Sequence, residues 1–254
     1  MNEAAAPAAR LAGLLRSADR AVALTGAGIS VPSGIPDFRT PQTGLWANVD
    51  PMEVAHISVF RRDPERFWRF YGSRFAMLRD KRPNAAHAAL AELERRGLIE
   101  AVITQNIDGL HRAAGTRDVI EVHGSIAGSR CLACGGEGEI GLDDVRGRLD
   151  AAPDGVPRCA DCDAPLKPGV VLFGELLPEA ALTRASELAA AADLLLCVGS
   201  SLEVYPVAEL PRITLAAGGE VALVTAGRTP YDRDATVKLG GDVVDALGAV
   251  LAAV

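Results

Sequence analysis

The sequence predicts an α/β fold in which a parallel sheet is covered by helices on both faces and is interrupted by two insertions. Short apolar runs alternate with helical patterns along most of the chain, as expected when strands are buried on both sides. A glycine-containing turn follows the first run, and two C-x2-C pairs stand in a stretch rich in Gly and Pro. The 254 residues, 49% apolar and 23% charged, suffice for one large core with smaller appendages.

The elements of the sheet can be placed from these patterns. Pro83 and Asn84 begin a helix that ends before the stop signal Gly97, a second helix covers residues 178–192, and residues 242–254 form a closing helix. The apolar runs expected to form the strands are residues 21–24, 99–103, 119–122, 194–198 and 221–224.

Two regions break the alternation and are interpreted as insertions into one α/β domain. Residues 38–80 are rich in Arg and aromatic side chains at helical spacing, and residues 126–168 hold the paired cysteines. The large sheet domain then consists of residues 1–37, 81–125 and 169–254. We expect a helical module from the first insertion and a zinc-binding module from the second.

Charge and hydropathy narrow the possible partners. A net charge of -7 gives no general basic surface for nucleic acid, so we expect no nucleic-acid partner. No segment approaches the roughly 20 apolar residues of a membrane span, and the N-terminus lacks the apolar core of a signal peptide. We therefore expect a cytoplasmic protein without a membrane partner, and a monomer, although nothing in the sequence fixes the oligomeric state.

Four cysteines have the spacing of a metal site. Cys131 and Cys134 form one C-x2-C pair, and Cys159 and Cys162 form another after twenty-four intervening residues. Two such pairs can bind one Zn²⁺ tetrahedrally, and four thiolates leave no position open for substrate, so the zinc would be structural. The alternative is two buried or disulfide-bonded pairs, which a cytoplasmic location disfavours. The remaining cysteine, Cys197, stands alone in an apolar run.

The first strand is followed by the turn Gly26-Ala27-Gly28, which has the form of a phosphate-binding loop. Glycines let the backbone N–H groups approach a pyrophosphate. The pattern is incomplete, because Val31 occupies the place of the third glycine and no acidic residue ends a second strand about 20 positions on. By itself the turn is compatible equally with cofactor binding and with a plain tight turn.

Polar side chains follow several of the expected strands. Gln105, Asn106 and Asp108 follow the second strand, and His123 follows the third. Each has an ordinary structural interpretation, since Asn and Asp shape turns and a single His is often a structural residue. Their common position at the carboxyl ends of strands, where open α/β sheets bind ligands, favours a functional site.

Taken together, the ordered motifs resemble the sirtuins, the NAD-dependent protein deacylases. The resemblance runs from about Arg20 to the C-terminus and includes GAGISVPSGIPDFR, PNAAHAAL, VITQNIDGLH, the HG of VHGS, both C-x2-C pairs, VVLFGELLP and GSSLEVYPVAELP. It implies a Rossmann-like domain with a small zinc-ribbon and a helical module. It also implies that the acyl oxygen of a modified lysine attacks the nicotinamide ribose of NAD, and that free lysine, nicotinamide and O-acyl-ADP-ribose result.

The resemblance also implies the roles of individual residues. His123 would be the general base, a role that suits a side chain whose ordinary pKa is about 6.5, and Asn106 would also take part in catalysis. Val171, Phe173, Gly174 and Glu175, with Val204 opposite, would hold an extended acyl-lysine peptide by backbone pairing. The implied NAD contacts are Gly26, Ala27, Gly28, Ile29, Asp37, Phe38, Arg39, Gln105, Asn106, Ile107, Asp108, Gly199, Ser200, Ser201, Thr225, Asp242 and Val243.

Two positions bear on specificity. Sirtuins generally have Asn where this chain has Thr225, and a hydroxyl offers one donor in place of an amide, so the contact to the adenosine ribose is altered. Tyr71 and Arg74 form a Y-x-x-R arrangement, three residues apart on one helix face. In sirtuins that remove succinyl and malonyl groups, a Tyr and Arg so spaced reach the acyl carboxylate, which predicts desuccinylation. The alternative is an amphipathic helix with Tyr71 in the core.

Two other classes of function fit these residues less well than deacylation. A protein ADP-ribosyltransferase would use the same NAD pocket, but His123 and the acyl-lysine edge argue against it. A non-catalytic zinc module would not need the polar strand ends.

Overall fold

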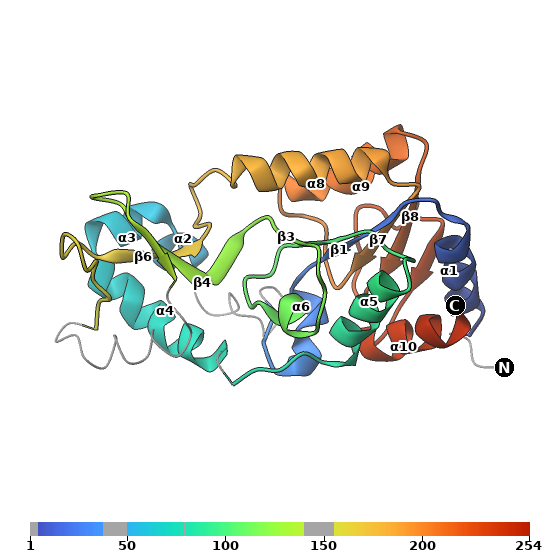
Figure 1. The fold of residues 1–254 in the computed structure, drawn as a ribbon, viewed down its shortest axis with the longest axis horizontal. Coiled ribbons are helices and arrows are strands. Elements are labelled where there is room, and N and C mark those ends of the chain that lie inside the picture. Colours follow the sequence, from blue (N-terminus) through green and yellow to red (C-terminus); the bar gives the residue numbers. More distant parts are fainter. Residues whose placement is uncertain (1–4, 38–49, 79, 140–154) are drawn as a thin grey trace.

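A computed structural model describes residues 5–37, 50–78, 80–139 and 155–254. Within these residues, β1 (Ala21–Thr25), β2 (Val102–Thr104), β3 (Val119–Glu121), β7 (Leu194–Val198), β8 (Glu220–Val224) and β9 (Val237–Leu239) form a six-stranded sheet in the order β3-β2-β1-β7-β8-β9. Every neighbouring pair is parallel. The predicted fold class is therefore confirmed (Figure 1).

Helices cover both faces of this sheet because its strands alternate between two apolar cores. Ala21 and Ala23 of β1 face the core that α1 (Ala5–Ser17), α5 (Ala85–Arg95) and α10 (Val243–Ala253) share. Val22 and Leu24 face the core beneath α8 (Glu179–Ala191) and α9 (Leu210–Ala216). Figure 1 shows α8 and α9 along one side and α1, α5 and α10 along the other. Cys197 of β7 belongs to the second core, and burial raises the pKa of its thiol.

Local sequence signals begin α5, α8 and α10 where they were expected. Asn84 caps α5 by accepting hydrogen bonds from the backbone N–H groups of Ala86 and His87, and Asp242 caps α10 in the same way. Gly97 takes the left-handed conformation just beyond α5, with φ +74°. One strand prediction was inaccurate, because the strand expected at residues 99–103 begins later and forms β2 at Val102–Thr104. The strand β9 was not predicted.

A smaller antiparallel sheet lies beside the large one. Its strands β4 (Gly124–Cys131), β5 (Glu137–Glu139) and β6 (Leu166–Val170) follow the order β5-β4-β6. The helices α2 (Pro51–Val54), α3 (Ile57–Arg62) and α4 (Pro64–Leu78) pack on it around a third apolar core that includes Phe67 and Trp68. The residue boundaries expected for the three parts of the chain remain a prediction.

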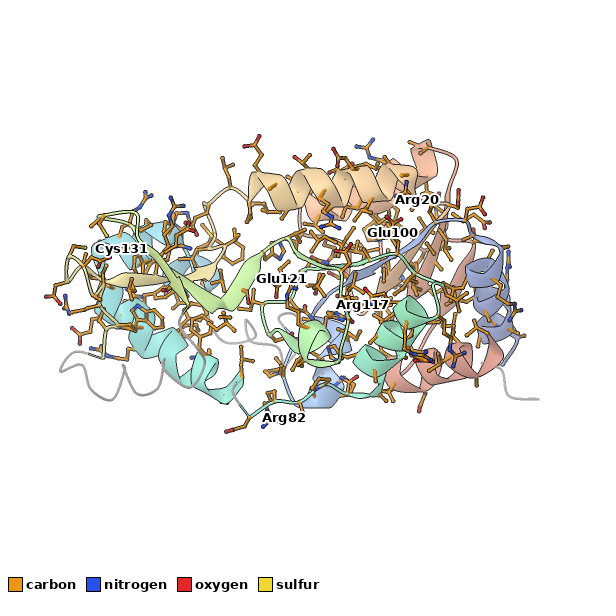
Figure 2. All side chains as sticks on the ribbon, in the orientation of Figure 1. Arg20, Arg82, Glu100, Arg117, Glu121 and Cys131 are labelled. Atoms are coloured by element: carbon orange, nitrogen blue, oxygen red, sulfur yellow. The ribbon has the colours of Figure 1, made fainter. Side chains whose placement is uncertain are left out.

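The remaining elements in the described residues are short. They are α6 (Leu110–Ala113) and the 3₁₀ turns η1 (Ala27–Ile29), η2 (Val31–Ser33) and η3 (Val207–Glu209). Arg20, just before β1, donates two hydrogen bonds to the Glu100 carboxylate at 2.9 and 3.0 Å, which ties the start of β1 to the segment that enters β2 (Figure 2). No helix in the described part of the chain is both long and apolar enough to cross a membrane.

Candidate active site

A cavity of about 1190 Å³ runs along the carboxyl ends of the large sheet and reaches the small sheet. It brings together residues that the sequence predicted at separate strand ends. The predicted site residues that line it are Gly26, Ala27, Gly28, Asp37, Tyr71, Gln105, Asn106, Ile107, His123, Val171, Phe173, Gly174, Glu175, Gly199, Ser200, Ser201, Val204, Thr225, Asp242 and Val243.

At one end of the cavity two glycines lie too close to the neighbouring turn to carry a side chain. A Cβ on Gly28 would lie 2.7 Å from the Gly199 carbonyl oxygen, and a Cβ on Gly26 would lie 2.9 Å from the Ser200 side chain. The Gly28 N–H group donates to the Gly199 carbonyl at 2.8 Å, so the turn after β1 rests directly on the turn after β7. This close contact leaves backbone and small side chains facing a ligand, as a dinucleotide pyrophosphate requires.

Polar side chains connect the ends of β1, β2 and β7. The Gln105 side-chain amide donates to the Ser200 hydroxyl at 2.9 Å. The buried Asn106 amide donates to the Gly26 carbonyl and to the Ser30 hydroxyl, both at 3.2 Å. Because each of these groups has a partner on another strand end, the strand ends hold one another in place before any ligand binds.

His123 lies between the two ends of the cavity and is held in one tautomer. Its Nδ1 lies 3.0 Å from the Gln105 carbonyl oxygen, and a carbonyl can only accept, so Nδ1 carries the proton. In the neutral ring Nε2 then keeps a lone pair. Burial lowers the pKa of His123, and the Gln105 hydrogen bond opposes that shift in part. The ring is therefore neutral near pH 7 and can accept a proton at Nε2.

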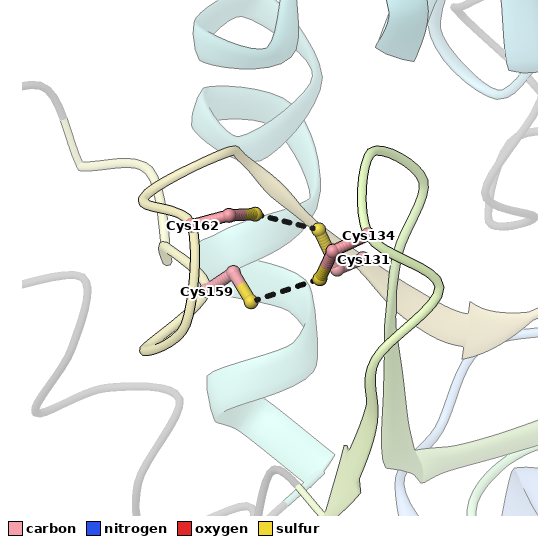
Figure 3. A group of neighbouring side chains, drawn as sticks. All are labelled: Cys131, Cys134, Cys159 and Cys162. Carbon is pink, nitrogen blue, oxygen red and sulfur yellow. Dashed lines mark hydrogen bonds between the residues drawn. The ribbon is translucent and has the colours of Figure 1, made fainter.

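The four paired cysteines converge on one point of the small sheet. Their sulfur atoms all lie within 4.8 Å of one another, with Cys131 and Cys162 3.4 Å apart and Cys134 and Cys159 3.7 Å apart (Figure 3). A disulfide would need about 2.05 Å, whereas Zn–S bonds of about 2.3 Å in a tetrahedron place the sulfurs about 3.8 Å apart. The donor set fits zinc.

Comparisons with known proteins agree with this architecture. Residues 26–206 match the model of the Sir2 family. The chain belongs to the Sir2 family. An NAD-dependent protein deacetylase of Thermotoga maritima is 46% identical over 91% of this chain and 92% of its own length. An NAD-dependent protein deacylase of Pyrococcus furiosus is 47% identical over 82% of each chain.

Solved Sir2 structures superimpose over nearly the whole chain. One, described as Sir2 with a p53 peptide and NAD+, has a TM-score of 0.87 at 44% identity and covers 96% of each chain. Another, Sir2Tm bound to a propionylated peptide, has a TM-score of 0.86 at 43% identity with the same coverage. This Sir2-family chain is an NAD-dependent protein deacylase with NAD as cosubstrate and a four-cysteine zinc site.

Several predicted residues lie away from the cavity of this deacylase. Ile29 is fully buried beneath the glycine turn, and Asp108 accepts a hydrogen bond from the Ser30 hydroxyl at 2.7 Å. The described residues that line the cavity do not include Arg74, whose guanidinium lies 3.7 Å from the centre of the Phe70 ring and donates to the Phe70 carbonyl. Phe38 and Arg39 lie outside the described residues.

Other residues of the site were not predicted. Ser30 connects Asn106, Asp108 and His87, and its hydroxyl is fully enclosed. Its place in GAGIS, two residues after Gly28, was the signal that could have identified it. Further unpredicted residues that line the cavity are Val31, Pro32, Ala55, Phe75, Val170, Leu172 and Tyr205.

Proposed function

We propose that this deacylase removes acyl groups from lysine side chains of proteins, with His123 as the general base. The observation that carries the proposal is the position of His123. Its unprotonated Nε2 belongs to a ring that lines the cavity between a glycine cradle at one end and the segment of residues 171–175 at the other. A peptide strand in the cavity would place its acyl-lysine next to this base.

The residues of the glycine end suit the individual parts of NAD. We assign the pyrophosphate to Gly26, Ala27 and Gly28, next to Gly199, Ser200 and Ser201, with the buried Ile29 supporting the turn from beneath. The nicotinamide and its ribose are assigned to Asn106 and Ile107 with Gln105, next to Asp37, and Asp108 acts indirectly by accepting the hydrogen bond of the Ser30 hydroxyl. Thr225, Asp242 and Val243 are assigned to the adenosine. Bound NAD supplies a ribose carbon that becomes electrophilic as nicotinamide leaves.

The chain's own residues then have three tasks. Asn106, fixed by Gly26 and Ser30, orients the nicotinamide ribose. His123 removes a proton from a ribose hydroxyl at Nε2, while the Gln105 carbonyl stabilises the Nδ1–H of the resulting imidazolium. Val171, Phe173, Gly174, Glu175 and Val204 hold the peptide, as the acetylated and propionylated peptides bound to related Sir2 proteins suggest.

Nicotinamide release that depends on an acylated peptide tests the proposal. The wild type should release nicotinamide and deacylate the peptide in equal amounts, whereas an ADP-ribosyltransferase would transfer labelled ADP-ribose to protein. In His123→Ala, kcat should fall by about 10²–10⁴-fold. Zinc content and thermal unfolding serve as controls for folding. Near-normal turnover in a folded His123→Ala variant would refute the general-base assignment.

The apolar side of the cavity supports a proposal for the acyl group that is removed. Ala55, Phe75 and Leu172 line it together with Tyr71, which favours short apolar acyl groups such as acetyl and propionyl. Tyr71 packs between the rings of Phe67 and Phe75, with centroid distances of 4.8 and 5.0 Å. Desuccinylation is the second candidate, since Tyr71 reaches the cavity and Arg74 lies one helical turn away on the same helix.

For desuccinylation the Arg74 guanidinium must leave the Phe70 ring, a contact that contributes about 0.5–1 kcal/mol at exposed sites. A hydrogen bond to a carboxylate contributes about 1.5–3 kcal/mol, so a succinyl group could draw the guanidinium into the cavity. Comparing kcat/KM on one peptide carrying acetyl or succinyl, for the wild type and Arg74→Ala, decides between the candidates. Arg69→Ala, on the same helix, is the matched control.

We also propose that the enzyme acts in the cytoplasm, because thiolate ligands persist in a reducing compartment, and that it is a monomer. Light scattering on the purified zinc-loaded chain tests the oligomeric state, and a dimer mass would contradict it.

A further inference from the structure

Lys167 is a buried lysine whose charge is fully partnered. It lies in β6 with 7% of its surface exposed. Its ammonium donates to the Val170 carbonyl at 2.7 Å and to the Pro168 carbonyl at 3.1 Å, and it lies 3.0 Å from the Glu175 carboxylate. An ammonium has three donors, so each has an acceptor. Lysines are rarely buried unless paired in this way, and neither the cofactor nor the metal accounts for this one.

Glu175 connects Lys167 to the tight turn formed by residues 172–175. The carboxylate oxygen Oε2 that contacts Lys167 also accepts the Leu172 N–H at 2.9 Å, and the Glu175 N–H donates to the Leu172 carbonyl at 3.0 Å. Within this turn Gly174 has φ +83°, and a Cβ on it would lie 2.5 Å from Nε2 of His56. The turn is therefore closed by a side chain on one side and packed against a ring on the other.

The same turn forms the peptide end of the cavity. The Val171 N–H donates to the His123 carbonyl at 2.9 Å, which joins the segment to the residue that carries the general base. Phe173 donates to the Ala55 carbonyl at 3.0 Å and accepts from the Ile57 N–H at 2.9 Å. Three of these backbone groups are thus fixed by main chain, whereas the Leu172 N–H and the Val170 carbonyl depend on the Lys167–Glu175 pair.

We infer that Lys167 is a positioning residue for the acyl-lysine peptide, acting through the Val170 carbonyl and the Glu175 carboxylate to hold residues 171–175 in the binding geometry. This inference rests on the proposed function. Lys167 does not line the cavity and touches no substrate, so its effect is confined to the shape of the peptide edge.

A second lysine provides a matched control at the other end of the cavity. Lys238 donates to the Gly227 carbonyl at 2.7 Å and to both carboxylate oxygens of Asp232 at 2.8 Å. Gly227 lines the cavity beside Thr225, at the end assigned to adenosine. Both lysines hold a cavity loop through a carbonyl and a carboxylate, but on opposite sides of His123.

Steady-state kinetics on Lys167→Met and Lys238→Met separates the two ends. In Lys167→Met the KM for the acylated peptide should rise about tenfold or more, because misplacing a binding edge by about 1 Å is costly, while the KM for NAD stays within about twofold. In Lys238→Met the KM for NAD should rise and the KM for the peptide should not. Equal changes in both constants for both variants would overturn the inference.

Lys167→Met alone could fold poorly, so a double variant is compared with it. Peptide binding is measured directly on the zinc-loaded proteins in the absence of NAD. Removing one partner of a buried pair leaves an uncompensated charge, whereas Lys167→Met combined with Glu175→Gln removes both. If the pair acts as one unit, the double variant should bind the peptide no more weakly than Lys167→Met alone, and independent multiplying losses would refute the pairing.

The wild type distinguishes the inference from the function on which it rests. If the wild type neither binds nor turns over acylated peptide, the proposed function fails and the inference fails with it. If the wild type is active and Lys167→Met keeps the wild-type affinity for peptide, only the inference fails.

Discussion

The two ends of the cavity are held in place by different kinds of interaction. The NAD end stands on the large sheet, whose strands are buried on both faces and whose glycine turns touch each other through main chain. The peptide end stands on the small sheet, where a metal site and a buried ion pair take the place of a second layer of helices. Apolar layers on both faces fix the first without a metal, whereas the second combines one apolar core with a metal site and a buried ion pair.

Removing the metal should have the largest effect, because it should disrupt the peptide end and leave the NAD end folded. Cys134→Ser should lose zinc, unfold the small sheet and abolish peptide binding, because structural zinc contributes on the order of 10 kcal/mol to the folding of such modules. The large sheet should keep its far-UV circular dichroism. Zinc content and peptide binding are the measurements. Cys197→Ala, in the core of the large sheet, is the control and should keep zinc. A Cys134→Ser chain that stays folded without metal would contradict the prediction.

A side chain in the glycine contact should damage the other end. A Cβ on Gly199 would lie 2.3 Å from the Ile29 nitrogen, and the φ of +61° is itself unfavourable for other residues. We expect Gly199→Ala to lower stability by about 2 kcal/mol and to weaken NAD binding at least about tenfold with zinc retained.

Gly248→Ala is the control for this substitution. A Cβ on Gly248 meets no atom within 4 Å and lies in α10, so alanine should raise stability by about 0.5–1 kcal/mol. Thermal unfolding of both variants checks the opposite signs, and a Gly199→Ala chain as stable as the wild type would refute the steric argument.

Acid should destabilise the NAD end through its buried histidines. Burial lowers the pKa of His111 to about 3, with neighbouring His87 acting in the same direction. As pH falls below about 6.5 the unfolded chain binds a proton that the folded chain does not, so stability decreases by about 1.4 kcal/mol for each pH unit between 6.5 and 3. His111→Gln should reduce this slope by one proton. Urea unfolding of both proteins at pH 7, 6 and 5 measures this slope. A slope that His111→Gln leaves unchanged would refute the role of His111.

The smallest expected effect concerns Thr225. A restored amide offers two donors where the hydroxyl offers one, so Thr225→Asn should lower the KM for NAD by about two- to tenfold, or about 0.4–1.4 kcal/mol. The KM for the peptide at the far end of the cavity should not change. A higher KM for NAD would show that the loop of residues 225–228 has adapted to the threonine.

The parts of the fold that were predicted are those with strong local signals. The strands β1, β7 and β8 are long apolar runs, and the helices α5 and α10 begin at Asn and Asp caps. By contrast, β9 has only three residues and includes Lys238, and β6 contains Pro168 and Gly169, so neither resembles a buried strand. The strands β6 and β9 form because each pairs with a neighbouring strand. That pairing cannot be inferred from the local sequence.

For the cavity, residue spacing predicted which residues meet but not how side chains turn. Tyr71 and Arg74 share a helix face as expected, yet Tyr71 reaches the cavity while Arg74 lies over Phe70. The direction of the Arg74 side chain depends on the Phe70 ring, which competes with the cavity for the guanidinium. Likewise, a lysine next to Pro168 gave no sign that a carboxylate eight residues later would pair with it.

The contact between Gly28 and Gly199 limits how this site can change during evolution. The obstacles to a side chain at either position are main-chain atoms of the opposite turn, so no substitution elsewhere can make room for one. A substitution of either glycine therefore cannot be compensated by a later mutation at another position. Lineages that alter the acyl or peptide preference must therefore do so from the opposite end of the cavity, while these two turns are inherited unchanged.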